Sequence, residues 1–145
     1  RATRCGPRPI PCLPSASRCK WSFAGGEEEH MIDKWIAEIK QQADPRELGM
    51  ILVHNGLVRA TSKDGKDVRG INLSTDNARL QELIQQYSSK QGIEAVRAWI
   101  NEGNLHIGDS IMYVLVAGRF RTDVLPAFES LIAAIKKEVV TEQEY

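Results

Sequence analysis

The residues of this chain that are best suited to chemistry surround its last predicted helix, and they are cations. Arg119 and Arg121 come just before that helix. Free N–H groups and the helix dipole make a helix N-terminus favourable for an anion, and two arginines strengthen that preference. In the alternative interpretation these arginines only pair with surface carboxylates, as isolated exposed arginines commonly do. The pattern therefore predicts either an anion-binding site or an ordinary charged surface.

Lys136 lies near the other end of the same predicted helix, on the row Phe128, Ile132 and Lys136 at the edge of an apolar stripe. Burial beside the core favours the neutral amine, which can act as a base or a nucleophile. A lysine that only extends its ammonium group to solvent is the alternative. About 13 residues separate Asp123 from Lys136, or roughly 20 Å of helix. Arg121 and Lys136 of one chain are therefore too far apart for one small ligand, and a pocket that uses both must be built across two subunits.

The helix that carries Lys136 is predicted to run from Asp123 to about Val140. Asp123 is the expected N-cap. That choice places Pro126 in the first turn, where proline is tolerated because its missing N–H would have no partner. One apolar stripe faces the core, and it contains Val124, Leu125, Phe128, Leu131, Ile132 and Ile135.

Apolar periodicity and turn residues predict the remaining elements of the domain. In order they are a helix from Met31 to Asp44, a strand from Met50 to Val58, a return strand from Val68 to Leu73, a helix capped by Ser74 and stopped by Gly92, a strand from Ile93 to Ile100, a loop from Glu102 to Asp109 and a buried strand from Ile111 to Ala117. This order predicts an α+β fold, with a mixed, largely antiparallel sheet and helices packed on one face.

Two glycine-containing pairs mark possible turns in the first half of the domain. The segment Lys63-Asp64-Gly65-Lys66 is predicted, by its Asp-Gly pair, to be the hairpin turn between the first two strands. Asn55-Gly56 is interpreted as a bulge within the first strand, although a hairpin turn at that point is the alternative. The first strand is therefore expected to continue past Gly56.

Residues 1–30 are predicted to be a disordered or non-native N-terminal extension. They contain four prolines and scattered arginines, without apolar periodicity. Their arginine and serine content, with no acidic residue before Glu27, also resembles an organellar transit peptide. Met31 opens the first clear helical pattern, so the domain is placed at residues 31–145.

Neither a disulfide framework nor a metal site is predicted. The three cysteines, Cys5, Cys12 and Cys19, are an odd number confined to the extension. No C-x-x-C pair or histidine cluster accompanies them. His54 and His106 are isolated along the sequence, so structural or surface roles are expected for them.

Charge and hydropathy exclude two classes of partner. The chain has a formal net charge of zero, and residues 1–30 hold five of its 19 Lys and Arg and three of its 19 Asp and Glu, which leaves the domain at −2. A protein that binds nucleic acid or a membrane surface would need a basic excess. No apolar run approaches the roughly 20 residues of a membrane-spanning helix.

Three segments, in order along the domain, share motifs with one enzyme family. The apolar run 49–59 opens with glycine and ends in Gly-Leu-Val-Arg. Residues 103–109 read Gly-Asn-Leu-His-Ile-Gly-Asp, a G-x-L-x-x-G-D loop before a buried strand. The pair Phe120-Arg121 precedes a helix that carries Lys136. In these segments the domain resembles the large, catalytic subunit of molybdopterin synthase, the MoaE-like family.

This resemblance implies an α/β hammerhead fold and a role in molybdenum cofactor biosynthesis. Proteins of that family transfer sulfur from a thiocarboxylated carrier protein to cyclic pyranopterin monophosphate, which yields molybdopterin, and they hold no cofactor of their own. The implied partners are the pterin precursor and a small ubiquitin-like sulfur carrier with a C-terminal Gly-Gly. The implied assembly is a homodimer within a cytoplasmic heterotetramer.

The resemblance also implies roles for individual residues. Lys136 matches a catalytic lysine, and Arg59 and Arg121 match arginines that hold the anionic groups of the substrate. Phe120 takes the place of the family's histidine, and Gln143 takes the place of a second functional lysine. Both are expected to contact the substrate, although glutamine is neither a nucleophile nor a cation.

An alternative function follows from the same departures. The chain would then be a catalytically impaired relative that keeps the fold and acts as a carrier-protein-binding or regulatory module. A scaffold domain with no role in pterin chemistry is a third hypothesis. Gln143 is the feature that separates the enzyme from the binding module.

Overall fold

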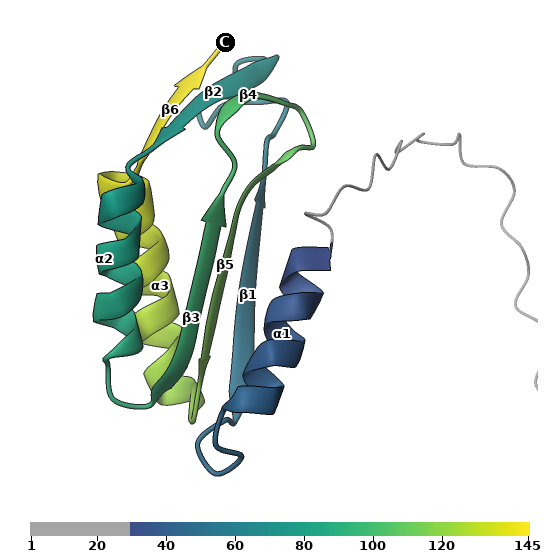
Figure 1. The fold of residues 1–145 in the computed structure, drawn as a ribbon. Helices are drawn as coiled ribbons and strands as arrows, with labels where there is room; N and C mark the ends of the chain where they lie inside the picture. Colours follow the sequence, from purple (N-terminus) through teal and green to yellow (C-terminus); the bar gives the residue numbers. More distant parts are fainter. Residues whose placement is uncertain (1–29) are drawn as a thin grey trace, which may run out of the picture.

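The computed structural model describes residues 30–145, which form three helices and six strands (Figure 1). In chain order these are α1 (Met31–Gln42), β1 (Met50–Leu57), β2 (Gly70–Thr75), α2 (Asn77–Ser88), β3 (Ile93–Ile100), β4 (Gly103–His106), β5 (Ser110–Gly118), α3 (Arg121–Glu138) and β6 (Val140–Glu144). The predictions for residues 1–29, including those for the three cysteines, lie outside the described residues. The predicted α+β class is confirmed.

The larger sheet has the strand order β1-β5-β3, and both of its pairings are antiparallel. The central strand β5 is the predicted buried run, and its residues from Met112 to Gly118 are all buried. Its apolar side chains on both faces require cover on both sides of the sheet. The register of β1 against β5 shifts between Gly56 and Leu57, which confirms the predicted bulge.

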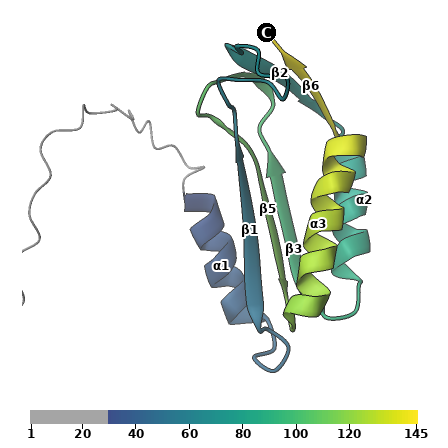
Figure 2. The same ribbon diagram turned by 180° about the vertical axis from the view of Figure 1, so that it is seen from behind.

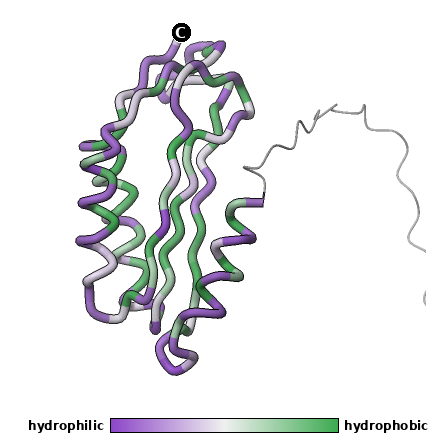
Figure 3. Tube along the Cα trace, in the orientation of Figure 1, coloured by the Kyte–Doolittle hydropathy of each residue, from purple (hydrophilic) through white to green (hydrophobic). Residues whose placement is uncertain are grey.

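Helices cover both faces of this sheet, so the prediction that all helices pack on one face is wrong for α1. The helices α2 and α3 pack on the face that includes Val114 and Val116 of β5. On the opposite face, α1 packs through Ile39 against Leu115 and Ala117 (Figures 1 and 2). The alternation of side chains along a strand explains this division, since successive residues of β5 point to opposite faces. Figure 3 shows apolar residues along the strands of this sheet and polar residues in the loops at its ends.

The smaller sheet has the strand order β4-β2-β6 and lies beyond one end of the larger sheet (Figure 1). Its strands correct three predictions. The strand β2 does not return along β1, because it pairs with β4 and β6. The predicted loop 102–109 contains β4, and the chain after α3 forms β6. Each of these short strands gains its hydrogen bonds from residues far away in the sequence, so local patterns revealed the strand β2 but not its partners, and did not reveal β4 or β6.

A turn does form at Asp64-Gly65, as predicted, but it closes only a short loop between the two sheets. The Gly65 N–H donates to the Ser62 carbonyl at 3.1 Å, and Thr61 and Asp67 form an isolated antiparallel bridge. Gly65 has a φ of 77°, a conformation that glycine adopts without strain. The turn therefore orients the segment 59–69 rather than joining β1 to β2 as a hairpin.

The caps of the two later helices differ from the predictions. Asp76 caps α2 by accepting the Arg79 N–H at 3.0 Å, whereas Ser74 lies within β2. The helix α3 begins at Arg121 with Phe120 as its N-cap, so Asp123 is a first-turn residue and not the cap. Pro126 consequently lies in the second turn of α3.

Candidate functional site

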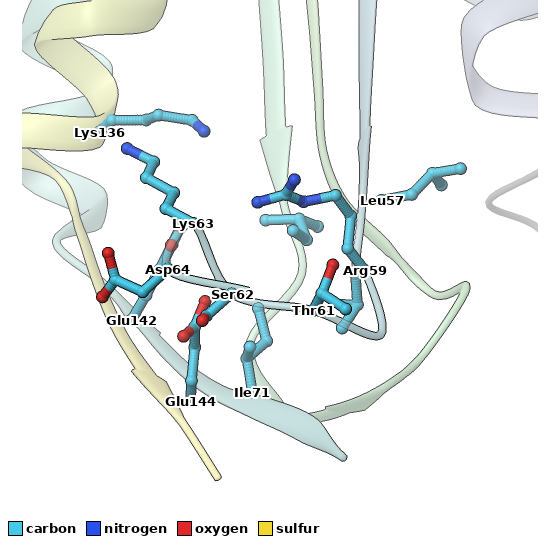
Figure 4. Close-up of a pocket in the computed structure, with 12 residues that line it drawn as sticks. Leu57, Arg59, Thr61, Ser62, Lys63, Asp64, Ile71, Lys136, Glu142 and Glu144 are labelled. Carbon is cyan, nitrogen blue, oxygen red and sulfur yellow. The ribbon is translucent and has the colours of Figure 1, made fainter. Parts of the chain in front are cut away.

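A cavity of about 350 Å³ lies where the end of β1, the segment 59–69, the C-terminal part of α3 and the strand β6 meet (Figure 4). Buried and half-buried apolar residues, among them Val58, Ile71 and Ile111, form part of its wall. The cavity therefore combines an apolar wall with the charged side chains described next, a combination typical of a site for a small polar ligand.

Three cations line this cavity: Arg59, Lys63 and Lys136. Figure 4 shows the Arg59 and Lys63 side chains pointing toward Lys136 across the cavity. Two of the three, Arg59 and Lys136, are residues that the sequence analysis assigned to the substrate. The structure thus brings together a predicted arginine and the predicted lysine, which are far apart in the sequence.

Local structure explains the position of Arg59 and Lys136. Val58 is buried, and its N–H and carbonyl are held by Asp109 and Gly108 at 3.0 and 2.9 Å, so the end of β1 is fixed and Arg59 follows directly. Lys136 follows Ile135, which is fully buried in the core. A lysine at the next helical position emerges at the edge of the core, as the apolar stripe of α3 predicted.

Carboxylates occupy another part of the same cavity. Asp64 follows Lys63 in the turn, and Glu142 and Glu144 come from β6. Within residues 30–145, none of these carboxylates lies within 4.0 Å of a cavity cation; the ion pairs that do form involve other residues. The cations are therefore available to an anionic ligand.

His54 lies beside this cavity, on the face of β1 that meets α3. Its ring meets Phe128 edge to face at a centroid distance of 6.5 Å, and its Nε2 atom is buried without a hydrogen-bond partner. Burial, and secondarily the positive charge of Lys136, lower the pKa of His54 below its usual value. A structural or surface role was expected for this residue, and the structure places it half-buried next to the cavity.

Phe120 and Arg121 lie at the other end of α3 and do not line this cavity. The 15 residues from Arg121 to Lys136 correspond to roughly 22 Å of helix. Phe120 is 56% exposed, and the Arg119 guanidinium lies 4.6 Å from the centre of its ring. Arg119 also pairs with Glu47 at 3.5 Å, so the interpretation as a surface ion pair holds for this arginine.

Gln143 also lies away from the cavity cations. It is paired with Asn72 in the β2–β6 register, whereas its neighbours Glu142 and Glu144 line the cavity. Because successive residues of a strand point to opposite faces, Gln143 faces away from the cavity with Asn72. Asn72 is exposed and hydrogen-bonds to Asn104 at 2.6 Å, which marks that face as the outer one.

Sequence reasoning missed Lys63 and the two glutamates of the cavity. Lys63 was interpreted only as part of a turn, and no local pattern indicates that this turn folds over α3. Alternate glutamates in the segment 140–144 are the one signal that pointed to a two-sided strand. Within residues 30–145, no group of three or more His, Cys, Asp and Glu is placed to hold a metal ion.

The fold and the cavity define a small α+β protein that can hold an anion between two antiparallel sheets. Residues 27–138 match the model of the MoaE protein family, and the chain belongs to that family. Membership implies the role of a molybdopterin synthase large subunit in molybdenum cofactor biosynthesis. The resemblance seen in three sequence segments is thereby confirmed.

Solved structures support the same fold. Molybdopterin synthase from Staphylococcus aureus matches with a TM-score of 0.63 and 21% identity, over 76% of this chain and 82% of that chain. A complex of subunits 1 and 2 of the molybdopterin-converting factor from Helicobacter pylori matches with a TM-score of 0.64 and 16% identity, over 81% and 77% of the two chains. Molybdopterin cofactor biosynthesis protein E from Burkholderia multivorans matches with a TM-score of 0.62 and 19% identity, over 78% and 79%.

Two further comparisons complete the description. No curated protein sequence matches the chain significantly. In the part of the chain that the structure describes, no helix has the length and apolar content needed to cross a membrane.

Proposed function

We propose that this protein transfers sulfur from a thiocarboxylated carrier protein to cyclic pyranopterin monophosphate, forming molybdopterin. The observation that carries the proposal is the convergence of Arg59 and Lys136 on one cavity in a chain of the MoaE family. An arginine holds a phosphate or carboxylate through two parallel hydrogen bonds, and a lysine beside an apolar wall can transfer a proton or act as a nucleophile.

Lys136 is the proposed catalytic residue, and Arg59 is the proposed anchor for the anionic group of the substrate. Arg59 fixes the ligand from the end of β1, while Lys136 reaches it from α3. Half-buried Ile111 and buried Ile71 supply an apolar wall against which the uncharged part of a ligand can pack.

The proposed partner is a small ubiquitin-like carrier whose C-terminal Gly-Gly tail delivers the sulfur. The Helicobacter pylori relative, which was solved as a complex of two subunits, supports this proposal. A homodimer is also proposed, in which Arg121 of a second copy completes the site. The roughly 22 Å between Arg121 and Lys136 along α3 supports a shared site over a self-contained one.

The test of this function is a reconstituted reaction with thiocarboxylated carrier and cyclic pyranopterin monophosphate. We expect wild-type protein to form molybdopterin and Lys136→Ala to lose at least about 100-fold in rate, as expected for loss of a general acid–base group. Lys137→Ala is the matched control, because Lys137 is an exposed neighbour that does not line the cavity. Equal rates for the two variants would contradict the role of Lys136.

A second candidate function is a catalytically impaired relative that only binds the carrier or regulates its use. Gln143 favours this candidate, because it offers neither a cation nor a nucleophile and faces away from the cavity. Wild-type protein that retains the carrier in a pull-down but forms no molybdopterin would support this second function. Wild-type protein that neither binds the carrier nor forms molybdopterin would exclude both functions.

A further inference from the structure

Lys63 is a cavity cation that neither the family motifs nor the proposed reaction uses. It lies in the turn between Ser62 and Gly65, far from α3 in the sequence, yet it lines the cavity together with Lys136. Figure 4 shows its side chain extended toward that of Lys136. Lys63 is exposed, as Arg59 and Lys136 are, so the three cations meet at the open side of the cavity.

The turn holds Lys63 in place through several backbone contacts. The Ser62 N–H donates to the Lys66 carbonyl at 2.9 Å, and the Val68 N–H donates to the Ala60 carbonyl at 2.9 Å. Lys63 and Asp64 are therefore the central residues of a closed turn, between the Ser62 carbonyl and the Gly65 N–H that bonds to it. These contacts fix the backbone of the turn, and with it the point from which the Lys63 side chain starts.

The cavity is lined by as many carboxylates (Asp64, Glu142, Glu144) as cations, but the two sets are not joined in ion pairs. Two ammonium groups and a guanidinium converge on the cavity, and like charges that approach one another are destabilising. In the described part of the chain, none of the three is paired with a carboxylate within 4.0 Å. An anion placed between them would remove this repulsion and accept charge-assisted hydrogen bonds from each side.

We propose that Lys63 is a third substrate-binding cation, which holds a phosphate-bearing ligand together with Arg59 and Lys136. This inference rests on the proposed function and deepens it, because it assigns the phosphate end of the ligand to the side of the cavity formed by the turn. It also supplies a second lysine to a cavity from which Gln143 faces away. The ligand class is a phosphate ester, such as the cyclic phosphate of the proposed substrate, or a similar compact anion.

The test measures binding of two probes by isothermal titration calorimetry with the full chain: inorganic pyrophosphate and cyclic pyranopterin monophosphate. We expect Lys63→Ala to weaken both about tenfold, the size of one lost charge-assisted hydrogen bond. Lys63→Arg should restore binding to within about threefold, since it keeps the charge and the donors. Lys66→Ala is the matched control, because Lys66 lies in the same turn but does not line this cavity.

The two probes separate this inference from the proposed function. If wild-type protein binds pyrophosphate but not the pterin, and Lys63→Ala weakens pyrophosphate, the inference stands and the proposed substrate is wrong. If Lys63→Ala and Lys66→Ala bind both probes equally well, the inference is wrong whatever the reaction. Failure of wild-type protein to bind either probe also overturns it. Thermal unfolding of each variant shows whether it is folded.

Discussion

The two ends of α3 carry cations in opposite circumstances. At its C-terminal end, Lys136 meets Arg59 and Lys63 in a cavity, and none of the three is paired with a carboxylate of the described residues. At its N-terminal end, Arg119 is paired with Glu47 and stacked on the exposed Phe120 ring. The smaller sheet explains the difference, because β6 and the segment 59–69 border a cavity only at the C-terminal end.

This comparison shows that a local sequence pattern for anion binding and the actual position of a cavity need not coincide. An arginine pair before a helix is the stronger local pattern for anion binding, yet one of its members forms a surface ion pair. The cavity instead forms where strands that are distant in the sequence meet the helix. The cations that share a cavity are therefore brought together by the fold and not by a local sequence motif.

The largest effect is expected from replacing Arg121, which tests whether the two ends of α3 act together across a dimer. We expect Arg121→Ala to reduce molybdopterin formation by about 100-fold if it completes a partner's site. Mixing Arg121→Ala with Lys136→Ala protein should restore about a quarter of wild-type activity, because half of the randomly mixed dimers then carry one intact site.

The control for this complementation is a mixture of Arg121→Ala protein with the double variant Arg121→Ala/Lys136→Ala, which can form no intact site. Native mass spectrometry shows whether mixed dimers are present. Mixed dimers without recovered activity would mean that the N-terminal end of α3 does not contribute to the cavity of a second subunit.

An effect of intermediate size is expected when Arg59 is replaced, and Arg119 at the other end of the helix is the residue to compare with it. Arg59→Ala should weaken binding of the pterin precursor about 30-fold, because it removes a charged donor from the cavity. Arg119→Ala should change binding less than about twofold, since that side chain is occupied by Glu47 and Phe120. Calorimetric titration of both variants measures the difference, and similar losses would contradict the contrast between the two ends.

The smallest expected effect concerns His54, which lies beside the cavity end of the helix. Burial and Lys136 lower its pKa in the folded protein, so the unfolded chain binds a proton at a higher pH than the folded chain does. Because of His54, the free energy of unfolding decreases as the pH falls from about 6.5, the pKa of this residue in the unfolded chain, toward its lower pKa in the folded protein.

Urea unfolding of wild type, His54→Phe and His54→Gln between about pH 7.5 and pH 5 measures this contribution. Both variants should lose less stability than wild type as the pH falls, because neither side chain titrates. Only His54→Phe should also gain stability at pH 7.5, since it removes the unpaired buried Nε2 atom. A fall identical to that of wild type in both variants would contradict the shifted pKa.

Much of the fold followed from local patterns. Periodicity located α1, α2 and α3, and continuous or alternating apolar residues located β1, β3 and β5. The errors were concentrated in the smaller sheet, where β4 and β6 are short and lack a strong apolar pattern. Helix caps were also misplaced, because Ser74 and Asp123 are good capping residues by type but the pairing of β2 and the extended backbone of Phe120 fixed the boundaries elsewhere.

The amino-acid sequence by itself determined the three helices and the strands of the larger sheet, and it supplied most of the chemically capable residues. Burial of apolar side chains and the conformational preferences of turns act over a few residues, so they can be read locally. Arg121 and Lys136 were singled out by their positions at the last helix, whereas Arg59 was identified only through the family resemblance. Only the tertiary structure decided which of these residues share a cavity. The pairing of β2 with β6 and the fold of the turn at Lys63 depend on contacts between distant segments, and those contacts bring Lys63 to Lys136 and turn Gln143 away.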